Sequence, residues 1–411
     1  MTGPLFLSRP LAVIVATLAM TTGLAAVATA QDDTIPDSRA ATIEQAQTQK
    51  STELHPFEPN KVEAVLDRVE NTLLNGGVSV HPFFENAYSG GGFTLGAGYA
   101  TRVSSYNVLD VRGSVTFKGY TRIETAFLAP RLFDRRGTLT LIGGWRNATQ
   151  VGFYGIGHAN TSVHDRANYS FTQPYASAAL SVMPTRKLLV LAGALDVAKW
   201  DVGPGKGSDP SVDEVYTPAT LQGLGATPTY LHSQGTIGLD FRPAPGYARR
   251  GGYYAVTLED YHDTQGLNGF RMTDYEAIQH IPILHDVWVV SLHGLVELSN
   301  AASNQVIPYF MLPSLGGGSS LRGFSSWRFR DLNSLLLQAE WRILANRFID
   351  TAVLYDAGRV AARRSDLTDG PLKNDYGLGF RLHGPMTTPL RIEFVHSNEG
   401  LSLVFSSKAA F

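Results

Sequence analysis

One arginine in a glycine-rich segment carries the most informative chemistry of this sequence. Residues 315–324 read Leu-Gly-Gly-Gly-Ser-Ser-Leu-Arg-Gly-Phe, with Arg322 near the end. Glycines let a loop turn tightly and approach another backbone closely. A guanidinium buried in such a loop needs a carboxylate partner, because an unpaired buried charge is strongly destabilising. The segments that follow offer two candidates, Glu340 and Asp356.

Other residue patterns do not support catalysis or metal binding. The chain has no cysteine, which excludes disulfides and thiolate sites. His158 and His164 lie in a polar stretch without the spacing of metal ligands. His396 and Ser397 are adjacent in a strand pattern, so their side chains point to opposite faces and cannot act together. We therefore predict a protein that is not an enzyme and that needs no cofactor and no metal ion.

Strands must position the arginine and its candidate partners, because residues 77–411 show a hydrophobic period of two. In the last five segments, apolar and aromatic side chains occupy one face and charged side chains the other. Glu340 and Asp356 both fall on the charged face. A soluble sandwich would bury the apolar face, whereas a membrane barrel turns it toward lipid and keeps the charges in the lumen. Alternation alone does not separate these two architectures.

Composition favours the membrane barrel. The chain holds 41 glycines, 17 tyrosines and 20 phenylalanines, and after residue 30 it has no apolar run long enough for a spanning helix. Its net charge of −2 gives no basic field for nucleic acid. We expect sixteen strands, an even number typical of bacterial barrels. They are 77–86, 91–101, 108–118, 120–130, 137–150, 168–183, 186–199, 226–242, 250–262, 267–280, 286–299, 333–344, 347–358, 373–383, 389–397 and 400–408.

The first 76 residues divide into two predicted segments. An apolar run at 11–18 followed by Ala-Thr-Ala at 28–30 predicts a signal peptide, 1–30, cleaved near Ala30. Residues 31–76 read as a polar tether and one short amphipathic helix that begins at Asn60. We interpret this helix as a periplasmic collar on the barrel mouth; the alternatives are a plug in the lumen or a docking helix. The predicted fold class is all-β, a 16-stranded antiparallel transmembrane β-barrel preceded by these segments.

Connection lengths orient this barrel. Short turns at 183–186, 243–246 and 281–286 alternate with long polar connections at 200–225 and 300–332. Outer-membrane barrels place short turns toward the periplasm and long loops outside. The connection at 300–332, which contains Arg322, is therefore the sixth outer loop.

The motifs, taken in order, resemble those of the BamA/TamA superfamily of outer-membrane barrels, the bacterial surface antigen type. Residues 317–324 are similar to that superfamily's loop-six motif, and Arg-Phe-Arg-Asp at 328–331 follows. Segments 338–342 and 354–358 resemble its twelfth and thirteenth strands, and 153–157 resembles another typical segment. The chain ends in an alternating strand closing on Phe411, like the terminal β-signal that the assembly machinery reads. In that signal the outward residues are Leu401, Leu403 and Phe405.

The resemblance implies a specific site. Loop six would fold into the lumen, where Arg322 would pair with Glu340 and Asp356, with Gly323 and Phe324 completing the motif. We call these five residues the loop-six lock. Arg381, Arg391 and Glu393 are expected to extend it, and Leu354 stands where relatives often carry an aromatic residue that packs the loop.

The resemblance also implies a function in the insertion or translocation of proteins in the outer membrane of a Gram-negative bacterium. Expected partners are outer-membrane lipid and lipopolysaccharide, client barrels or secreted proteins, and a periplasmic accessory protein. Residues 31–76 do not show the βααββ pattern of a POTRA domain, so client capture is not carried over from the family. Two alternatives stay open: a passive or gated pore for small solutes, and a surface antigen with a structural role.

Overall fold

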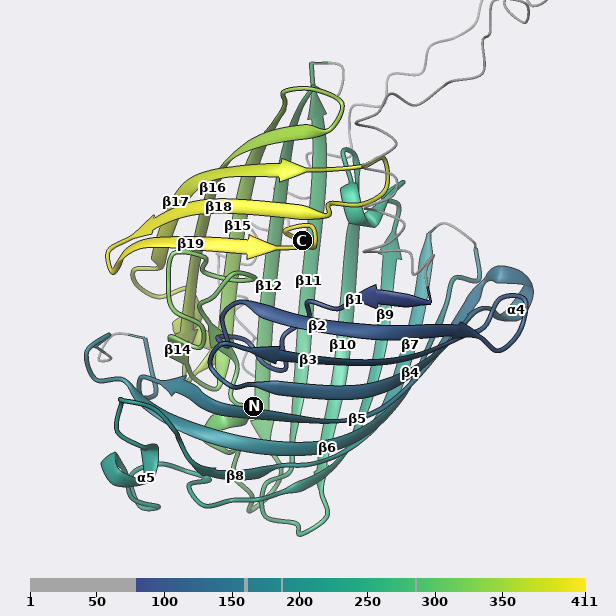
Figure 1. Cartoon of the computed structure of the whole chain (residues 1–411). Helices are drawn as coiled ribbons and strands as arrows, with labels where there is room; N and C mark the ends of the chain where they lie inside the picture. Colours follow the sequence, from purple (N-terminus) through teal and green to yellow (C-terminus); the bar gives the residue numbers. More distant parts are fainter. Residues whose placement is uncertain (1–78, 159–161, 186–187, 285–286) are drawn as a thin grey trace, which may run out of the picture. The chain divides into compact units, whose positions relative to one another are not determined.

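The computed structural model describes residues 79–158, 162–185, 188–284 and 287–411, all of which belong to one compact unit. These residues form one large, strongly curved antiparallel sheet with a smaller two-stranded sheet beside it (Figure 1). The predicted signal peptide (1–30) and the predicted tether with its helix (31–76) lie outside the described residues.

Most strands of the large sheet pair with the next one along the chain; the exception is the short strand Asp201–Pro204, which pairs with Ala167–Val182, while Leu189–Lys199 pairs directly with Thr229–Asp240. The strands are β1 (Val80–Pro82), β2 (Thr94–Arg102), β3 (Val108–Thr116), β4 (Thr121–Arg131), β5 (Gly137–Phe153), β6 (Ala167–Val182), β7 (Leu189–Lys199), β8 (Asp201–Pro204), β9 (Thr229–Asp240), β10 (Gly251–Asp263), β11 (Phe270–Ile283), β12 (Trp288–Ala301), β15 (Asn333–Leu344), β16 (Ile349–Ala361), β17 (Lys373–Leu382), β18 (Leu390–Ser397) and β19 (Gly400–Ser406). The helical turns are α4 (Leu132–Arg135), α5 (Val212–Val215), η1 (Pro245–Tyr247), η2 (Tyr309–Met311) and η3 (Arg364–Leu367).

The all-β class and the count of sixteen strands are confirmed for the part of the chain that the structure describes. β7 and β8 both pair with β6 and are separated only by Trp200, so together they act as one interrupted strand. Trp200 leaves the ladder because its backbone N–H donates to the carbonyl of Pro228 instead. With β7 and β8 taken together, the seventeen strands of the large sheet become sixteen.

The first and last strands end earlier than the sequence predicts. Within the described residues, the strand expected at 77–86 is limited to Val80–Pro82, because Pro82 has no N–H for the ladder and the chain then turns away. The last strand, expected at 400–408, ends at Ser406. The sequence had led us to expect Phe411 at the end of this strand. In the structure Phe411 lies beyond the strand.

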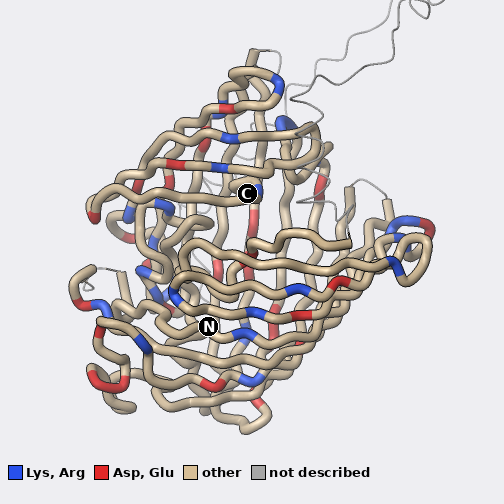
Figure 2. The backbone as a smooth tube through the Cα atoms, in the orientation of Figure 1, with Lys and Arg blue, Asp and Glu red and all other residues tan. Residues whose placement is uncertain are grey.

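The two faces of the sheet have the polarity of a membrane barrel, with apolar side chains outward and charged ones inward. On β17 and β19, the outward residues Leu378 and Phe405 are 57% and 62% exposed, whereas inward Glu340 on β15 is 2% exposed. Charged residues are distributed along the strands as well as in the loops (Figure 2). A soluble protein rarely exposes a continuous apolar surface of this extent. The burial pattern therefore decides against the soluble sandwich that alternation left open.

Aromatic packing closes the end of the sheet from which the long connections emerge. Tyr309 and Phe310 of η2 pack on Phe153 and Tyr169 of β5 and β6, with ring centroids 5.1–6.5 Å apart. Tyr88, from the connection between β1 and β2, stacks on Trp327 at 4.6 Å. None of the helices in the described ranges is long and apolar enough to cross a membrane.

The two ends of the large sheet do not meet in a ladder. β19 pairs with β18, and β1 pairs with β2, but among the described residues no strand pairing joins β19 to β1 or β2. We call this boundary the seam: β1 and β2 on one side, β19 on the other.

The assignment of the apolar face to lipid and of the charged face to the lumen can be tested by substitution. Leu378→Arg near the middle of β17 should lower the free energy of unfolding by about 2–4 kcal/mol, because a cation there faces lipid. Ala179→Arg, at a lumen-facing position of β6, is the matched control and should change it much less. Urea unfolding in phosphatidylcholine vesicles, followed by tryptophan fluorescence, measures both. Equal losses in the two variants would contradict the assigned faces.

Candidate functional site

The connection between β12 and β15 folds back as a compact hairpin that presents Arg322. Its short strands β13 (Ser314–Leu315) and β14 (Phe329–Arg330) pair with each other. Between them, Gly316 and Gly317 have φ angles of 114° and 101°, which favour glycine. A Cβ at Gly316 would lie 2.2 Å from the carbonyl oxygen of Ser325. The glycine run of the sequence is thus required where the loop reverses on itself.

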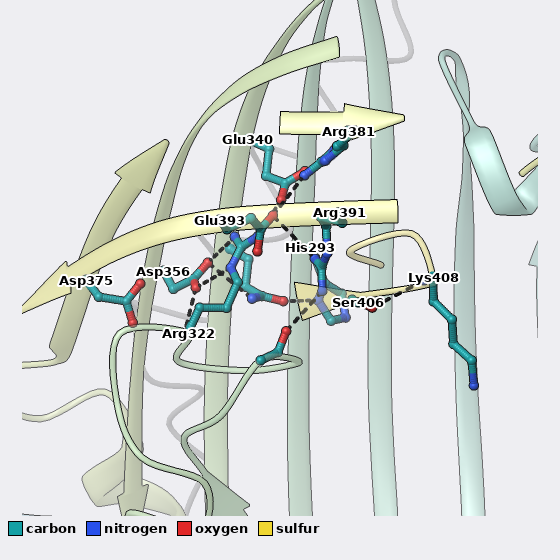
Figure 3. A network of polar contacts seen from close by, with 12 residues as sticks. His293, Arg322, Glu340, Asp356, Asp375, Arg381, Arg391, Glu393, Ser406 and Lys408 are labelled. Carbon is teal, nitrogen blue, oxygen red and sulfur yellow. Dashed lines mark hydrogen bonds and ion pairs between the residues drawn. The ribbon is translucent and has the colours of Figure 1, made fainter. Parts of the chain in front are cut away.

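Arg322 is buried among carboxylates from three strands (Figure 3). Its Nε and Nη2 donate to the two carboxylate oxygens of Asp356 at 2.7 and 2.6 Å, a bidentate pair. Its Nη1 donates to Glu340 at 2.5 Å and to Glu393 at 3.1 Å. The structure therefore places the two candidate carboxylates of the sequence in direct contact with the arginine and adds a third.

Gly323 and Phe324 fix the loop beside the arginine. The backbone N–H of Gly323 donates to Asp375 at 2.9 Å, and its carbonyl accepts from the hydroxyls of Ser397 and Ser402 at 2.8 and 3.1 Å. Phe324 is buried against Phe329, with ring centroids 5.2 Å apart. The loop is thereby bound to β17, β18 and β19 through its backbone as well as through Arg322.

A second layer of charge surrounds these contacts. Arg381 of β17 donates to Glu340 at 2.5 Å and lies 3.4 Å from Glu393. Arg391 of β18 lies 3.5 Å from Glu393 and donates to the carbonyl of Gly318 in the loop at 3.1 Å. Every charged residue expected to extend the network therefore takes part in it.

Sequence reasoning missed two members of this network. Asp375 faces Asp356 directly in the β16–β17 register and receives the N–H of Gly323. Gln338 donates to the carbonyl of Ser320 at 2.8 Å and to Asp356 at 3.1 Å. Both residues lie on the charged face of their strands, so the period-two pattern held the signal. The period-two pattern does not predict how far along each strand the loop contacts it, and so it could not assign these two residues to the network.

Leu354 packs inside the sheet, at 1% exposure, without the aromatic ring that relatives often have there. Around the loop, the apolar packing comes instead from a cluster within the loop and its neighbouring strands. Its members are Leu315, Leu321, Phe324, Phe329, Leu336 and Val360. Two phenylalanines of the loop itself thus supply aromatic packing.

The electrostatics of the site favour a permanently charged arginine. Burial alone would lower the pKa of Arg322, but Glu340, Asp356 and Glu393 outweigh burial and hold that pKa well above its usual value. A buried guanidinium with this many acceptors is satisfied only in one geometry. The arrangement is suited to fixing a loop, and among the described residues no group of His, Asp or Glu side chains gathers as a metal site would.

The predicted terminal signal is divided between two places. Leu401, Leu403 and Phe405 of β19 face outward and are 72%, 52% and 62% exposed. Phe411 instead stacks inside the sheet on His293, with centroids 5.1 Å apart, and lies 6.2 Å from His280. After Ser406 the chain leaves the ladder, so its last aromatic residue reaches the lumen side and not the lipid.

Comparison with known proteins places this geometry in a known fold. No family model and no curated protein matches the sequence. BamA from Haemophilus ducreyi lacking POTRA domains 1–3 superposes with a TM-score of 0.55 at 14% identity, over 77% of this chain and 67% of that one. CdiB from Escherichia coli superposes with a TM-score of 0.51 at 14% identity, over 79% of this chain and 58% of that one.

The fold is therefore that of the outer-membrane β-barrels. More narrowly, it is the fold of the BamA-type barrels, as the sequence motifs had indicated. This chain spans about two thirds of the length of the BamA chain and less of CdiB.

Removal of Arg322 tests the loop-six lock. Arg322→Ala should lower the free energy of unfolding by about 3–5 kcal/mol, because it leaves Asp356 buried without its cation and removes one of the two arginines that pair with Glu340. Arg363→Ala, whose side chain is 81% exposed, is the control and should have little effect. Heat-modifiable gel mobility and urea unfolding report the difference. An unaltered melting behaviour in Arg322→Ala would contradict a structural role for the contacts.

Gly323 offers an independent steric test. A Cβ at this position would lie 2.6 Å from the Cβ of Asp375 and 3.0 Å from that of Ser397. Gly323→Ala should therefore destabilise the barrel by about 1–3 kcal/mol through overpacking. Gly143→Ala, where no atom lies within 4 Å of the new Cβ, is the matched control. The two unfolding midpoints are compared; a larger loss in Gly143→Ala would refute the packing assignment.

Proposed function

We propose that this protein resides in the outer membrane of a Gram-negative bacterium and assists the insertion or translocation of β-rich proteins through its seam. The observation that carries the proposal is the unpaired edge of β19, which pairs with β18 on one side only. An exposed strand edge presents free N–H and C=O groups and binds another strand by β-augmentation. A client strand is the natural ligand of such an edge.

A large open space lies along the seam. A cavity of ≈ 1820 Å³ is bordered by residues 81–86 and by residues 403–410, the two sides of the seam. Across it, Lys408 lies 2.8 Å from Glu85. Because both side chains are partly exposed, this ion pair is weak and is readily exchanged for other contacts. The seam is thus bridged by side chains where other strand pairs are joined by backbone ladders.

The loop-six lock supports the proposal because it fixes the wall next to the seam. β15, β16, β17 and β18 each contribute a side chain to Arg322 or Gly323. In β19, Ser402 donates one hydrogen bond to Gly323. β19 is thus joined to this wall by its ladder with β18 and by one hydrogen bond from Ser402, while its other edge stays free for a strand.

The terminal residues fit the same role. Leu401, Leu403 and Phe405 stand outward on the free edge strand, where assembly machinery reading a β-signal would meet them. The proposed partners are outer-membrane lipid and lipopolysaccharide, client barrels or secreted proteins, and a periplasmic accessory protein that delivers them. The proposed export route begins with cleavage near Ala30.

Closing the seam tests the proposal directly. The chain has no cysteine, so Glu85→Cys with Lys408→Cys creates one defined pair across the seam. Joining the pair with a reducible bifunctional methanethiosulfonate should abolish acceleration of client-barrel folding in liposomes, and reduction should restore it. Thr236→Cys with Thr257→Cys, a facing pair on β9 and β10, is the control and should keep its activity when joined.

Two outcomes would count against the proposal. Acceleration that persists with the seam joined shows that the seam is not the route. Ion conductance through the unmodified barrel, with no effect on any client, favours the alternative of a solute pore.

A further inference from the structure

A second cavity lies at the outer rim, next to the loop-six lock: Ser397 lines the cavity and also donates to Gly323. It has a volume of ≈ 450 Å³ and is formed by three connections that are far apart in the sequence. His158 follows β5, residues 371–374 precede and begin β17, and residues 396–398 end β18. The turn after β18 lies at the same end of the sheet as the loop-six hairpin, which is the outer end. The cavity is therefore at the outer rim, and we call it the rim pocket.

Two cationic side chains lie at the rim pocket: Lys373 lines it, and Arg359 lies beside its wall at Pro371. His158 Nε2 donates to the carbonyl of Pro371 at 3.1 Å, and Arg359 Nη1 donates to the same oxygen at 3.5 Å. Lys373 Nζ lies 5.6 Å from the ring of Phe329. No carboxylate among the described residues lies within ion-pair distance of Arg359 or Lys373.

Other arginines near the rim pocket do have carboxylate partners. Arg328 pairs with Glu399 at 2.8 Å, and Arg363 pairs with Asp366 at 3.1 Å. At the rim pocket, burial together with Arg359 and Lys373 lowers the pKa of His158 to about 4. The imidazole is therefore neutral near pH 7, and after burial the nearby charges of Arg359 and Lys373 contribute to this lowering.

The rim pocket lies at one end of the outward apolar face of β17. Tyr376 is 57% exposed and faces outward at the outer end of β17, in edge contact with His396, which is also exposed. Leu378 and Phe380 continue the same outward face toward the middle of the strand. The pocket thus begins where the apolar surface ends, the level at which lipid headgroups lie and tyrosines gather.

We propose that the rim pocket binds a phosphate group, with Arg359 and Lys373 as its charged donors. A phosphate offers three acceptor oxygens, which suit one guanidinium and one ammonium that come from two neighbouring strands, β16 and β17. The phosphorylated headgroup of an outer-leaflet lipid presents this chemistry at the right depth, and free phosphate shares it. The lipid source rests on the outer-membrane location proposed above, whereas phosphate binding itself does not.

Charge-matched variants test the rim pocket. Arg359→Gln with Lys373→Gln removes two charges from it. Arg271→Gln with Arg363→Gln removes two charges from side chains that are 80% and 81% exposed and already paired with carboxylates. The full chain is placed in phosphatidylcholine nanodiscs, and retention of a bis-phosphorylated glucosamine lipid is measured by native mass spectrometry. We expect the pocket variant to bind about tenfold more weakly or worse, and the control to bind like the unaltered chain.

Three arms separate the sources of phosphate. Preference for the phosphorylated lipid over the same lipid after phosphatase treatment supports a headgroup site. Thermal stabilisation by inorganic phosphate alone, lost in the pocket variant, supports the site and assigns it to the free anion. Equal losses in the pocket and control variants, or no response to either probe, overturn the proposal. Client folding is assayed separately, so failure here is distinct from failure of the seam.

Discussion

The charge of Arg322, removed from water, constrains the rest of this structure. Burying a guanidinium costs several kcal/mol unless carboxylates surround it with good geometry. Here Glu340, Asp356 and Glu393 provide that geometry, and each comes from a different strand. The registers of β15, β16 and β18 must therefore be correct together, because a slip of one residue in any strand would turn its carboxylate toward lipid.

The same constraint explains why the interior is polar and the exterior apolar. A loop that carries a cation into the lumen requires anions on the inner face, and the inner face can hold them because the apolar side chains face outward. The result is a wall of four strands tied together through Arg322 and Gly323, with the free edge of β19 next to it.

Much of this arrangement was predictable from the sequence because strand periodicity is local. Alternation in Leu335–Leu344 and Ile349–Gly358 assigned Glu340 and Asp356 to one face without any knowledge of the fold. Asp375 escaped notice because its role depends on where Gly323 sits along β17, which is a tertiary fact. Phe411 was misplaced for a similar reason: its period fits a strand, but stacking on His293 and His280 competes with the ladder. The rim pocket was beyond reach, since His158 and Pro371 are 213 residues apart.

The partners of Arg322 all follow it in the chain, at separations of 18, 34 and 71 residues. Contacts of short separation form early, since they close small loops. The C-terminal quarter of the protein is thus able to assemble around its own loop before the earlier strands, β1 to β12, have curved round to meet it. The contacts of the loop-six lock all lie within this quarter, so the lock can form whatever the state of the seam.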